Sequence, residues 1–81
     1  MILNLYAKYK KLIEKMKNQP NGILLEEADR VLRHYGYQCD RKRGSHFQYV
    51  NENGDVYTLK AKNKLDKAYI ISILDRIGEN K

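Results

Sequence analysis

The sequence has little cysteine and no long apolar stretch, and each shortage excludes a class of structure. Cys39 is the only cysteine, so no internal disulfide can form, and with His34 and His46 it does not give the spacing of a metal-ligand set. No apolar run approaches the roughly 18 residues that cross a membrane. We therefore expect no structural zinc, no cofactor, and a soluble protein of the cytoplasm.

Acidic residues are also in the minority. Ten Asp and Glu face sixteen Lys and Arg, which gives a formal net charge of +6. The surplus lies mainly in the second half, because residues 1–40 carry seven basic and five acidic side chains and residues 41–81 carry nine and five. Such an excess favours a polyanionic partner such as RNA.

Three segments have the apolar spacing of amphipathic helices. Residues 3–17 and 25–35 each repeat apolar residues at steps of three and four, and so do residues 68–77. Residues 18–22 hold the only proline and a glycine, which predicts a turn after the first helix. Gly36 is placed to end the second helix.

Between the second and third helices the pattern changes to alternation. Residues 37–43, 45–51 and 55–60 are predicted strands. Gly44 joins the first two, and the loop Glu52–Gly54 joins the second and third, both with the residues of hairpin turns. A polar turn at residues 63–67 is expected to lead into the last helix.

The alternation fixes the length of the second hairpin loop. Phe47 and Tyr49 must share a sheet face with Tyr57 and Leu59, which requires an odd number of loop residues. A three-residue loop with Gly54 at its bulge satisfies this condition. The resulting pairs are Phe47 with Leu59, Tyr49 with Tyr57, and His46 with Lys60, and the opposite face shows His46, Gln48, Thr58 and Lys60.

The order helix, helix, three strands, helix predicts an α+β fold, a three-stranded antiparallel sheet with helices packed on one face. A chain of 81 residues is too short for two cores, so we expect a single domain over residues 1–81. The last helix should cover the sheet with Ala68, Ile70, Ile71, Ile73, Leu74 and Ile77. The predicted core consists of Leu12, Ile13, Leu25, Val31, Leu32, Phe47, Tyr49, Leu59, Ile70, Ile73, Leu74 and Ile77.

The densest chemistry lies in Arg41–Phe47, which reads Arg-Lys-Arg-Gly-Ser-His-Phe. Cations can hold a phosphodiester, glycine lets backbone amides approach it, and histidine titrates near neutrality. These residues point to nucleic-acid chemistry, although a tight basic hairpin turn with a surface histidine has the same sequence. A lone histidine such as His34, on the polar side of a helix, is more often a surface residue than a ligand.

Four segments carry a resemblance to a known family: Glu26–Tyr37, Arg41–Phe47, Tyr57–Leu59 and Lys67–Ile70. Together they make the chain similar, over residues 10–78, to the HicA toxins, the ribonuclease half of HicA/HicB toxin–antitoxin pairs. The most specific feature is Gly-Ser-His directly after a basic strand and an aromatic helix end. The resemblance implies a double-stranded-RNA-binding-domain-like fold, metal-free cleavage of mRNA, and neutralisation by a HicB-like antitoxin that covers the active face.

The family's histidine after Gly-Ser corresponds to His46, which the resemblance makes the catalytic residue. Many members have a proline and a second histidine after the third strand, whereas this chain has Lys62 where that histidine would be. A scheme with two histidines therefore does not carry over to this chain.

Metal-free RNA cleavage needs a base for the 2′-hydroxyl proton, cations for the phosphorane charge, and an acid for the leaving 5′-oxygen. His46 can supply the first or the last, and a water, a tyrosine or a neighbouring lysine could be the second proton carrier. The expected phosphate-binding residues are Arg41, Arg43, Gly44, Ser45, Lys60 and Lys62. Since period two puts Arg41 and Arg43 on one strand face, Lys42 should point away.

Two other functions fit the same sequence. A non-catalytic RNA-binding module, or an inactive HicA-like protein, would use the same basic face to bind an RNA backbone. The feature that favours it is Lys62 in place of the second histidine. A purely structural protein-interaction domain would neither cut nor bind RNA.

Overall fold

The computed structural model describes the backbone of residues 4–79 and the side chains from Tyr9 to Glu79. The predicted first helix is present as α1, Asn4–Asn18, although its expected first residue, Leu3, lies outside the described residues. A short 3-10 turn, η1 (Pro20–Gly22), follows where the proline predicted a turn. Within residues 4–79 we found no helix that combines the length and the apolar character needed to span a membrane.

The remaining elements follow the predicted order. They are α2 (Leu25–His34), β1 (Gln38–Arg43), β2 (His46–Val50), β3 (Val56–Lys60) and α3 (Lys67–Arg76). Each strand boundary lies within one residue of its prediction, and α2 ends ahead of Gly36, whose φ is +91°. The α+β order of a double-stranded-RNA-binding-like fold is confirmed.

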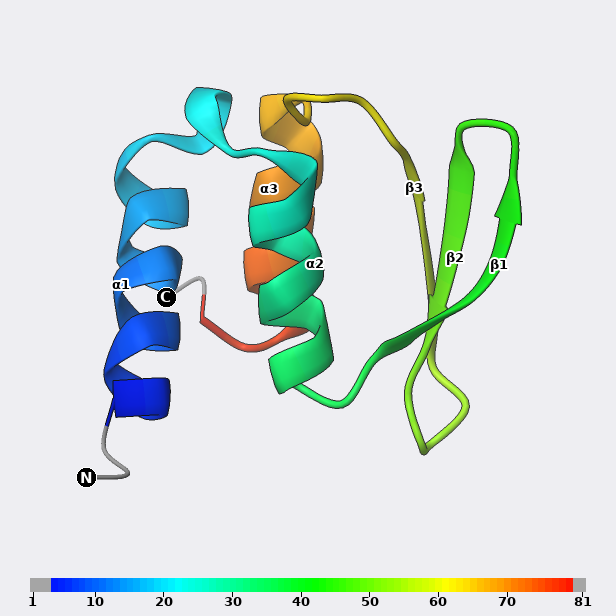
Figure 1. The fold of residues 1–81 in the computed structure, drawn as a ribbon, viewed down its shortest axis with the longest axis horizontal. Helices are drawn as coiled ribbons and strands as arrows, with labels where there is room; N and C mark the ends of the chain where they lie inside the picture. The colour runs from blue at the N-terminus through cyan, green and yellow to red at the C-terminus, as the bar shows by residue number, and fades with distance from the viewer. Residues whose placement is uncertain (1–3, 80–81) are drawn as a thin grey trace.

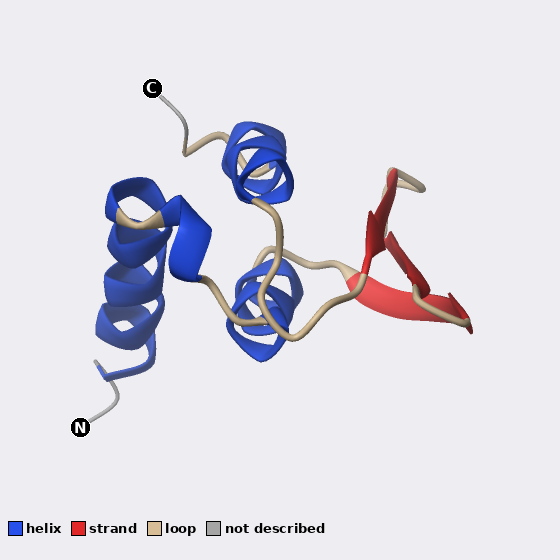
Figure 2. Ribbon diagram, turned by 90° about the horizontal axis from the view of Figure 1, so that it is seen from above, coloured by secondary structure: helices blue, strands red, loops and turns tan. Residues whose placement is uncertain are grey.

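The elements form layers. In Figure 1, α2 stands between α1 and the sheet, and the view from above in Figure 2 shows α2 and α3 together between α1 and the strands. The helices thus cover one face of the sheet, as predicted. The other face has no described element over it, and we call it the open sheet face.

The sheet is antiparallel in the order β1-β2-β3. Its β2–β3 register matches the prediction: His46 lies opposite Lys60, Phe47 opposite Leu59, and Tyr49 opposite Tyr57. Asn51 and Asp55 close the loop with a backbone hydrogen bond, which leaves the three predicted loop residues between them. Gly54 has a φ of +84°, which glycine adopts without steric cost.

The core lies between the sheet and the helices and extends to α1. Of the predicted core residues, Leu12, Leu25, Phe47 and Ile77 are only partly buried against it, and the other eight are buried. Six further residues are buried that the core prediction omitted: Met16, Ile23, Ala28, Tyr37, Tyr57 and Leu65.

Two details of the sequence prediction were wrong. Ile71 is 42% exposed and Ala68 is exposed, because only the Ile70, Ile73 and Leu74 side of α3 faces its neighbours. The expected polar turn at residues 63–67 contains the buried Leu65, whose N–H donates to the Ile23 carbonyl at 3.0 Å. That segment pairs with the entry to α2 and helps to close the core.

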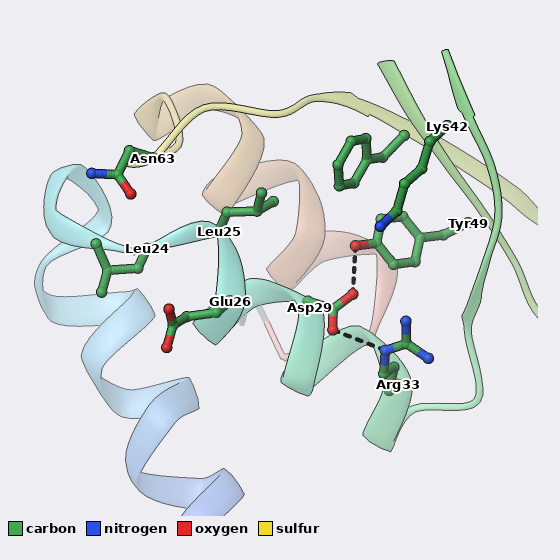
Figure 3. A pocket seen from close by; sticks show the side chains of 9 residues that line it. Leu24, Leu25, Glu26, Asp29, Arg33, Lys42, Tyr49 and Asn63 are labelled. Atoms are coloured by element: carbon green, nitrogen blue, oxygen red, sulfur yellow. Dashed lines mark hydrogen bonds and ion pairs between the residues drawn. The ribbon is translucent and has the colours of Figure 1, made fainter. Parts of the chain in front are cut away.

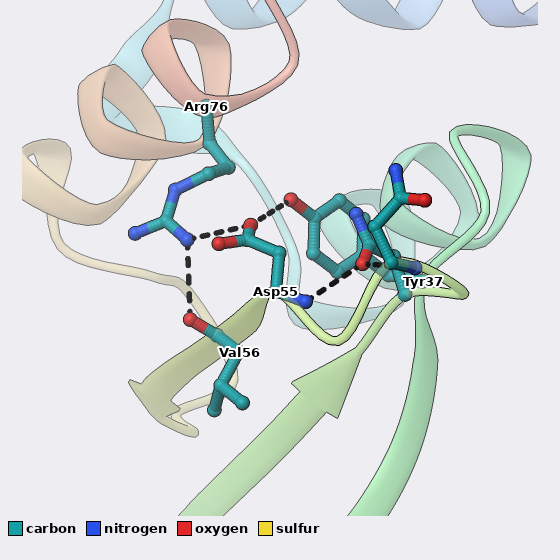
Figure 4. A network of polar contacts seen from close by, with 6 residues as sticks. Tyr37, Asp55, Val56 and Arg76 are labelled. Carbon is teal, nitrogen blue, oxygen red and sulfur yellow. Dashed lines mark hydrogen bonds and ion pairs between the residues drawn. The ribbon is translucent and has the colours of Figure 1, made fainter.

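A polar network ties one end of the sheet to α3 (Figure 4). Arg76 donates to the Asp55 carboxylate at 2.8 Å and to the Val56 carbonyl at 3.1 Å, and the Tyr37 hydroxyl donates to the same carboxylate. The Tyr37 hydrogen bond and then the Arg76 guanidinium lower the pKa of Asp55. Burial, and then the Asp55 carboxylate, raise the pKa of Tyr37.

Candidate nucleic-acid interface

The open sheet face carries polar and cationic side chains, because strand residues alternate between faces. Tyr57 and Leu59 of β3 are buried toward the helices, whereas Thr58 and Lys60 are exposed. On β2, Tyr49 is buried and His46 is exposed. The imidazole therefore stands in solvent on the side away from the core, as the loop length predicted.

The cationic row of this face consists of Arg43, His46 and Lys60. Arg43 is the Cα partner of His46 in one ladder, and Lys60 is its partner in the other. Directly opposed strand residues have Cβ atoms about 4.5–5.5 Å apart. All three residues are exposed, so His46 has a cation on either side and solvent above it.

A second row, Arg41, Gln48 and Thr58, lies next to the first along the strands. Arg41 reaches this row because the β1–β2 register shifts between Cys39 and Arg41, which leaves Asp40 as an extra residue. Lys42 points to the other face, where its Nζ lies 4.8 Å from the centre of the Phe47 ring. Arg41 and Arg43 therefore share a face and Lys42 does not, as period two predicted.

The turn beside the cationic row is tight. Arg43 and His46 are paired, so only Gly44 and Ser45 form the loop, and Gly44 has the left-handed φ of +56° that such a two-residue hairpin uses. The Ala61 N–H donates to the Ser45 carbonyl at 2.6 Å. This hydrogen bond holds the turn against the end of β3, next to Lys60.

The cations of the open sheet face have no acidic partner among the described side chains. Arg41, Arg43 and Lys60 take part in none of the ion pairs, which are Lys15–Glu27, Lys17–Glu79, Arg30–Glu26, Arg33–Asp29, Lys62–Asp66 and Arg76–Asp55. Lys62, which sequence reasoning grouped with the phosphate-binding residues, instead donates to Asp66 at 3.1 Å. The positive charge on this face is therefore free to act on a ligand.

The far end of the same face is less polar. Val50 is the partner of Gln38 in one ladder and of Val56 in the other. Val56 is 47% exposed, although valine is normally a core residue. The face therefore runs from cations at the hairpin turn to exposed aliphatic surface at the opposite end.

Sequence reasoning did not find a cavity of ≈ 290 Å³ on the helix side of the sheet (Figure 3). Lys42 and Phe47 line it from the strands, and Leu25 lines it from α2. The Tyr49 hydroxyl donates to Asp29 at 2.6 Å, and the other oxygen of Asp29 accepts from Arg33 at 2.8 Å. The cavity lies across the sheet from His46, so it is a separate feature.

His34 lies away from the sheet, at the end of α2. Its ring stacks on Tyr9 of α1 with 4.1 Å between centroids and meets Tyr35 edge-on at 5.2 Å. It is exposed, as expected, but it also joins α1 to α2. Across the side chains that the structure describes, no three His, Cys, Asp or Glu residues cluster in a way that could hold a metal ion.

A family model described as "HicA toxin of bacterial toxin-antitoxin" matches residues 26–78. The chain belongs to this family. The matched segment begins in α2 and ends just after α3, so it contains every strand of the open sheet face. This HicA-family chain therefore carries the toxin domain of a toxin–antitoxin pair, and α1 and η1 precede the matched residues. No curated protein and no solved structure matched the chain.

Proposed function

We propose that this HicA-family toxin is a metal-independent endoribonuclease that cleaves mRNA on the open sheet face, with His46 as its general acid–base residue. One observation carries the proposal: an exposed imidazole stands between Arg43 and Lys60, and neither cation pairs with a carboxylate among the described side chains. Unpaired cations on both sides of a proton carrier suit a reaction at a phosphodiester.

In the proposed reaction, His46 takes the proton from a ribose 2′-hydroxyl, and the 2′-oxygen attacks the adjacent phosphorus. Arg43 and Lys60 stabilise the negative charge of the phosphorane, and the Gly44–Ser45 turn positions the phosphate. The bond to the 5′-oxygen then breaks as that oxygen receives a proton. The products are a 2′,3′-cyclic phosphate and a 5′-hydroxyl end.

The burial of the tyrosines near the sheet bears on which group acts as the second proton carrier. Tyr49 and Tyr57 are buried on the helix side, and Tyr37 is buried with its hydroxyl bonded to Asp55. Their positions argue against these three tyrosines and favour a water or Lys60 as the group that protonates the leaving oxygen. Arg41 extends the phosphate-binding surface by one row, and Lys62 can join it only by leaving Asp66, an exposed pair that typically contributes no more than about 1 kcal/mol.

The antitoxin proposal follows from the same surface. A HicB-like antitoxin that lays acidic side chains over the Arg41, Arg43 and Lys60 end would block His46. Apolar contacts at Val50 and Val56 would anchor it at the opposite end, where exposed aliphatic surface is available. One partner surface would thus meet both halves of the face.

The proposed activity is tested by incubating the purified chain with total RNA in the presence of a chelator. Fragments with cyclic phosphate ends are the expected product, and intact RNA that shifts on a gel would instead support a non-catalytic RNA-binding module. The absence of a second histidine on the open sheet face is the observation that favours this alternative. Intact RNA without a shift would refute both.

A further inference from the structure

The row next to His46 contains two neutral side chains to which no role has been given. Gln48, on the central strand, faces Thr58 on one side and Arg41 on the other. Successive same-face residues of a strand are roughly 7 Å apart, so Gln48 lies about that distance from His46. A nucleic-acid strand held at His46 and running along β2 therefore reaches this row with a neighbouring nucleotide.

The chemistry of the two side chains matches a ribose hydroxyl. The Gln48 amide offers both donors and an acceptor, and the Thr58 hydroxyl can do either. Neither side chain hydrogen-bonds to another described side chain or backbone group, since none of the side-chain hydrogen bonds involves them. The 2′-hydroxyl, which is itself donor and acceptor, is the group by which a protein distinguishes RNA from DNA.

The described part of the open sheet face carries no phenylalanine, tyrosine or tryptophan ring on which bases could stack. Sheets that bind single-stranded RNA through its bases stack them on aromatic residues. Here the phenylalanine and tyrosine residues of the three strands are Phe47, Tyr49 and Tyr57, and all three face the helices. A nucleic acid on the open sheet face therefore meets mainly polar and cationic groups, with the His46 imidazole as the one ring on this face among the described side chains.

We propose that Gln48 and Thr58 select RNA over DNA by hydrogen-bonding the 2′-hydroxyl of a nucleotide adjacent to the one held at His46. The inference rests on the proposed function, because it uses the same face and the same polymer. It adds a preference for RNA at the binding step, before cleavage, that depends on two residues outside the cationic row.

The test is a binding measurement in which cleavage cannot interfere. Oligonucleotides of one sequence, made as RNA and as DNA, are titrated against the full chain carrying His46→Ala. We expect tighter binding of RNA, and a ratio of the two dissociation constants that falls about threefold to tenfold when Thr58→Val or Gln48→Met is added, as expected for one lost hydrogen bond. Thermal unfolding of each variant checks that it remains folded.

Two controls isolate the 2′-hydroxyl contact. Thr58→Ser keeps the hydroxyl and should keep the preference for RNA. Gln38→Met removes an exposed amide from the same face but two rows from His46, and it should leave the ratio unchanged.

The outcomes separate this proposal from the nuclease proposal. Equal weakening of RNA and DNA binding by Thr58→Val and Gln48→Met, or an unchanged ratio, refutes the selectivity role even if the wild-type chain cuts RNA. Conversely, wild-type protein that leaves RNA intact refutes the nuclease while a lowered ratio still supports the selectivity role. Failure to bind either oligonucleotide counts against both.

Discussion

Tyr49 and Asp29 join the centre of the sheet to α2 through a hydrogen bond of 2.6 Å. The tyrosine is 1% exposed, and burial together with the carboxylate raises the pKa of its hydroxyl. The same carboxylate accepts from Arg33, so one aspartate orients a strand residue and a helix residue at once. The relative position of β2 and α2 therefore depends on a polar contact as well as on apolar packing.

Removing Tyr49 and removing Asp29 from this hydrogen bond should lower the free energy of unfolding by different amounts. Tyr49→Phe loses the bond but leaves Asp29 with Arg33, and we expect a loss of about 1 kcal/mol in the free energy of unfolding. Asp29→Ala leaves a buried hydroxyl without an acceptor and should cost about 1–3 kcal/mol. Urea denaturation measures both. Equal costs would contradict this, and would mean that water from the adjacent cavity satisfies the hydroxyl.

His46→Ala should abolish cleavage while leaving RNA binding in place. Loss of a general acid or base lowers rates by roughly 10²- to 10⁴-fold, whereas the cations that hold phosphate remain. Single-turnover cleavage and a binding titration give the two readouts. The matched control is His34→Ala, which removes the other histidine and its stack on Tyr9. It should change neither property, and equal cleavage by wild type and His46→Ala would refute the catalytic assignment.

RNA affinity should fall steeply as salt rises, because binding releases counterions from the phosphates. Arg43→Ala or Arg41→Ala should weaken binding uniformly across sequences and reduce the salt slope by about one each. Arg30→Ala is a suitable control, because that arginine lies on α2 and pairs with Glu26. An unchanged salt dependence of RNA binding after Arg43→Ala would mean that Arg43 does not contact a phosphate.

Stability at low pH should depend on Asp55. Its pKa is lowered in the folded state, so its contribution is complete above the unfolded value of about 4 and is lost as the pH falls through the lowered pKa. Arg76→Met removes one of the two donors and should raise that pKa, which carboxyl titration by NMR would show directly. The loss of stability between neutral and acidic pH should become smaller. Arg30→Met should leave the Asp55 titration unchanged.

Antitoxin binding should be prevented by a charge at Val56 but not by a charge at Ile71. Val56→Asp puts a charge on the aliphatic end of the open sheet face and should prevent co-purification with the antitoxin. Ile71→Asp changes the other large exposed apolar residue among the described side chains, which lies on α3 beside α1, and it should have no effect. If Ile71→Asp prevents the complex and Val56→Asp does not, the antitoxin binds the helices and not the open sheet face.

Alternation and loop length were sufficient to predict how β2 pairs with β3. Four residues must lie on one side of the sheet: Phe47, Tyr49, Tyr57 and Leu59. Only a loop with an odd number of residues places them there, so the alternation and the loop length together fix the register of β2 and β3. The exposed position of His46 opposite Lys60 came with it. This part of the site was predictable because it depends on local geometry.

Contacts between segments far apart in the sequence were not predictable in this way. Ile23 and Leu65 lie in connections without periodicity, and they are buried because the two connections pair with each other. The ion pair that holds Lys62 to Asp66 needs side-chain positions that composition does not give. The extra residue at Asp40 changes how β1 aligns with β2, and no turn residue marks it.

The position of α1 separates two effects that mutations can have on this toxin. Ile13 and Met16 of α1 are buried in the core, and α1 itself packs against α2 and α3 on the side away from the strands (Figure 1). Changes in α1 should therefore alter the fraction of molecules that are folded, while each folded molecule keeps the same open sheet face. We expect mutations in the first helix to change the amount of folded toxin, and mutations on the strands to change the activity of each folded molecule.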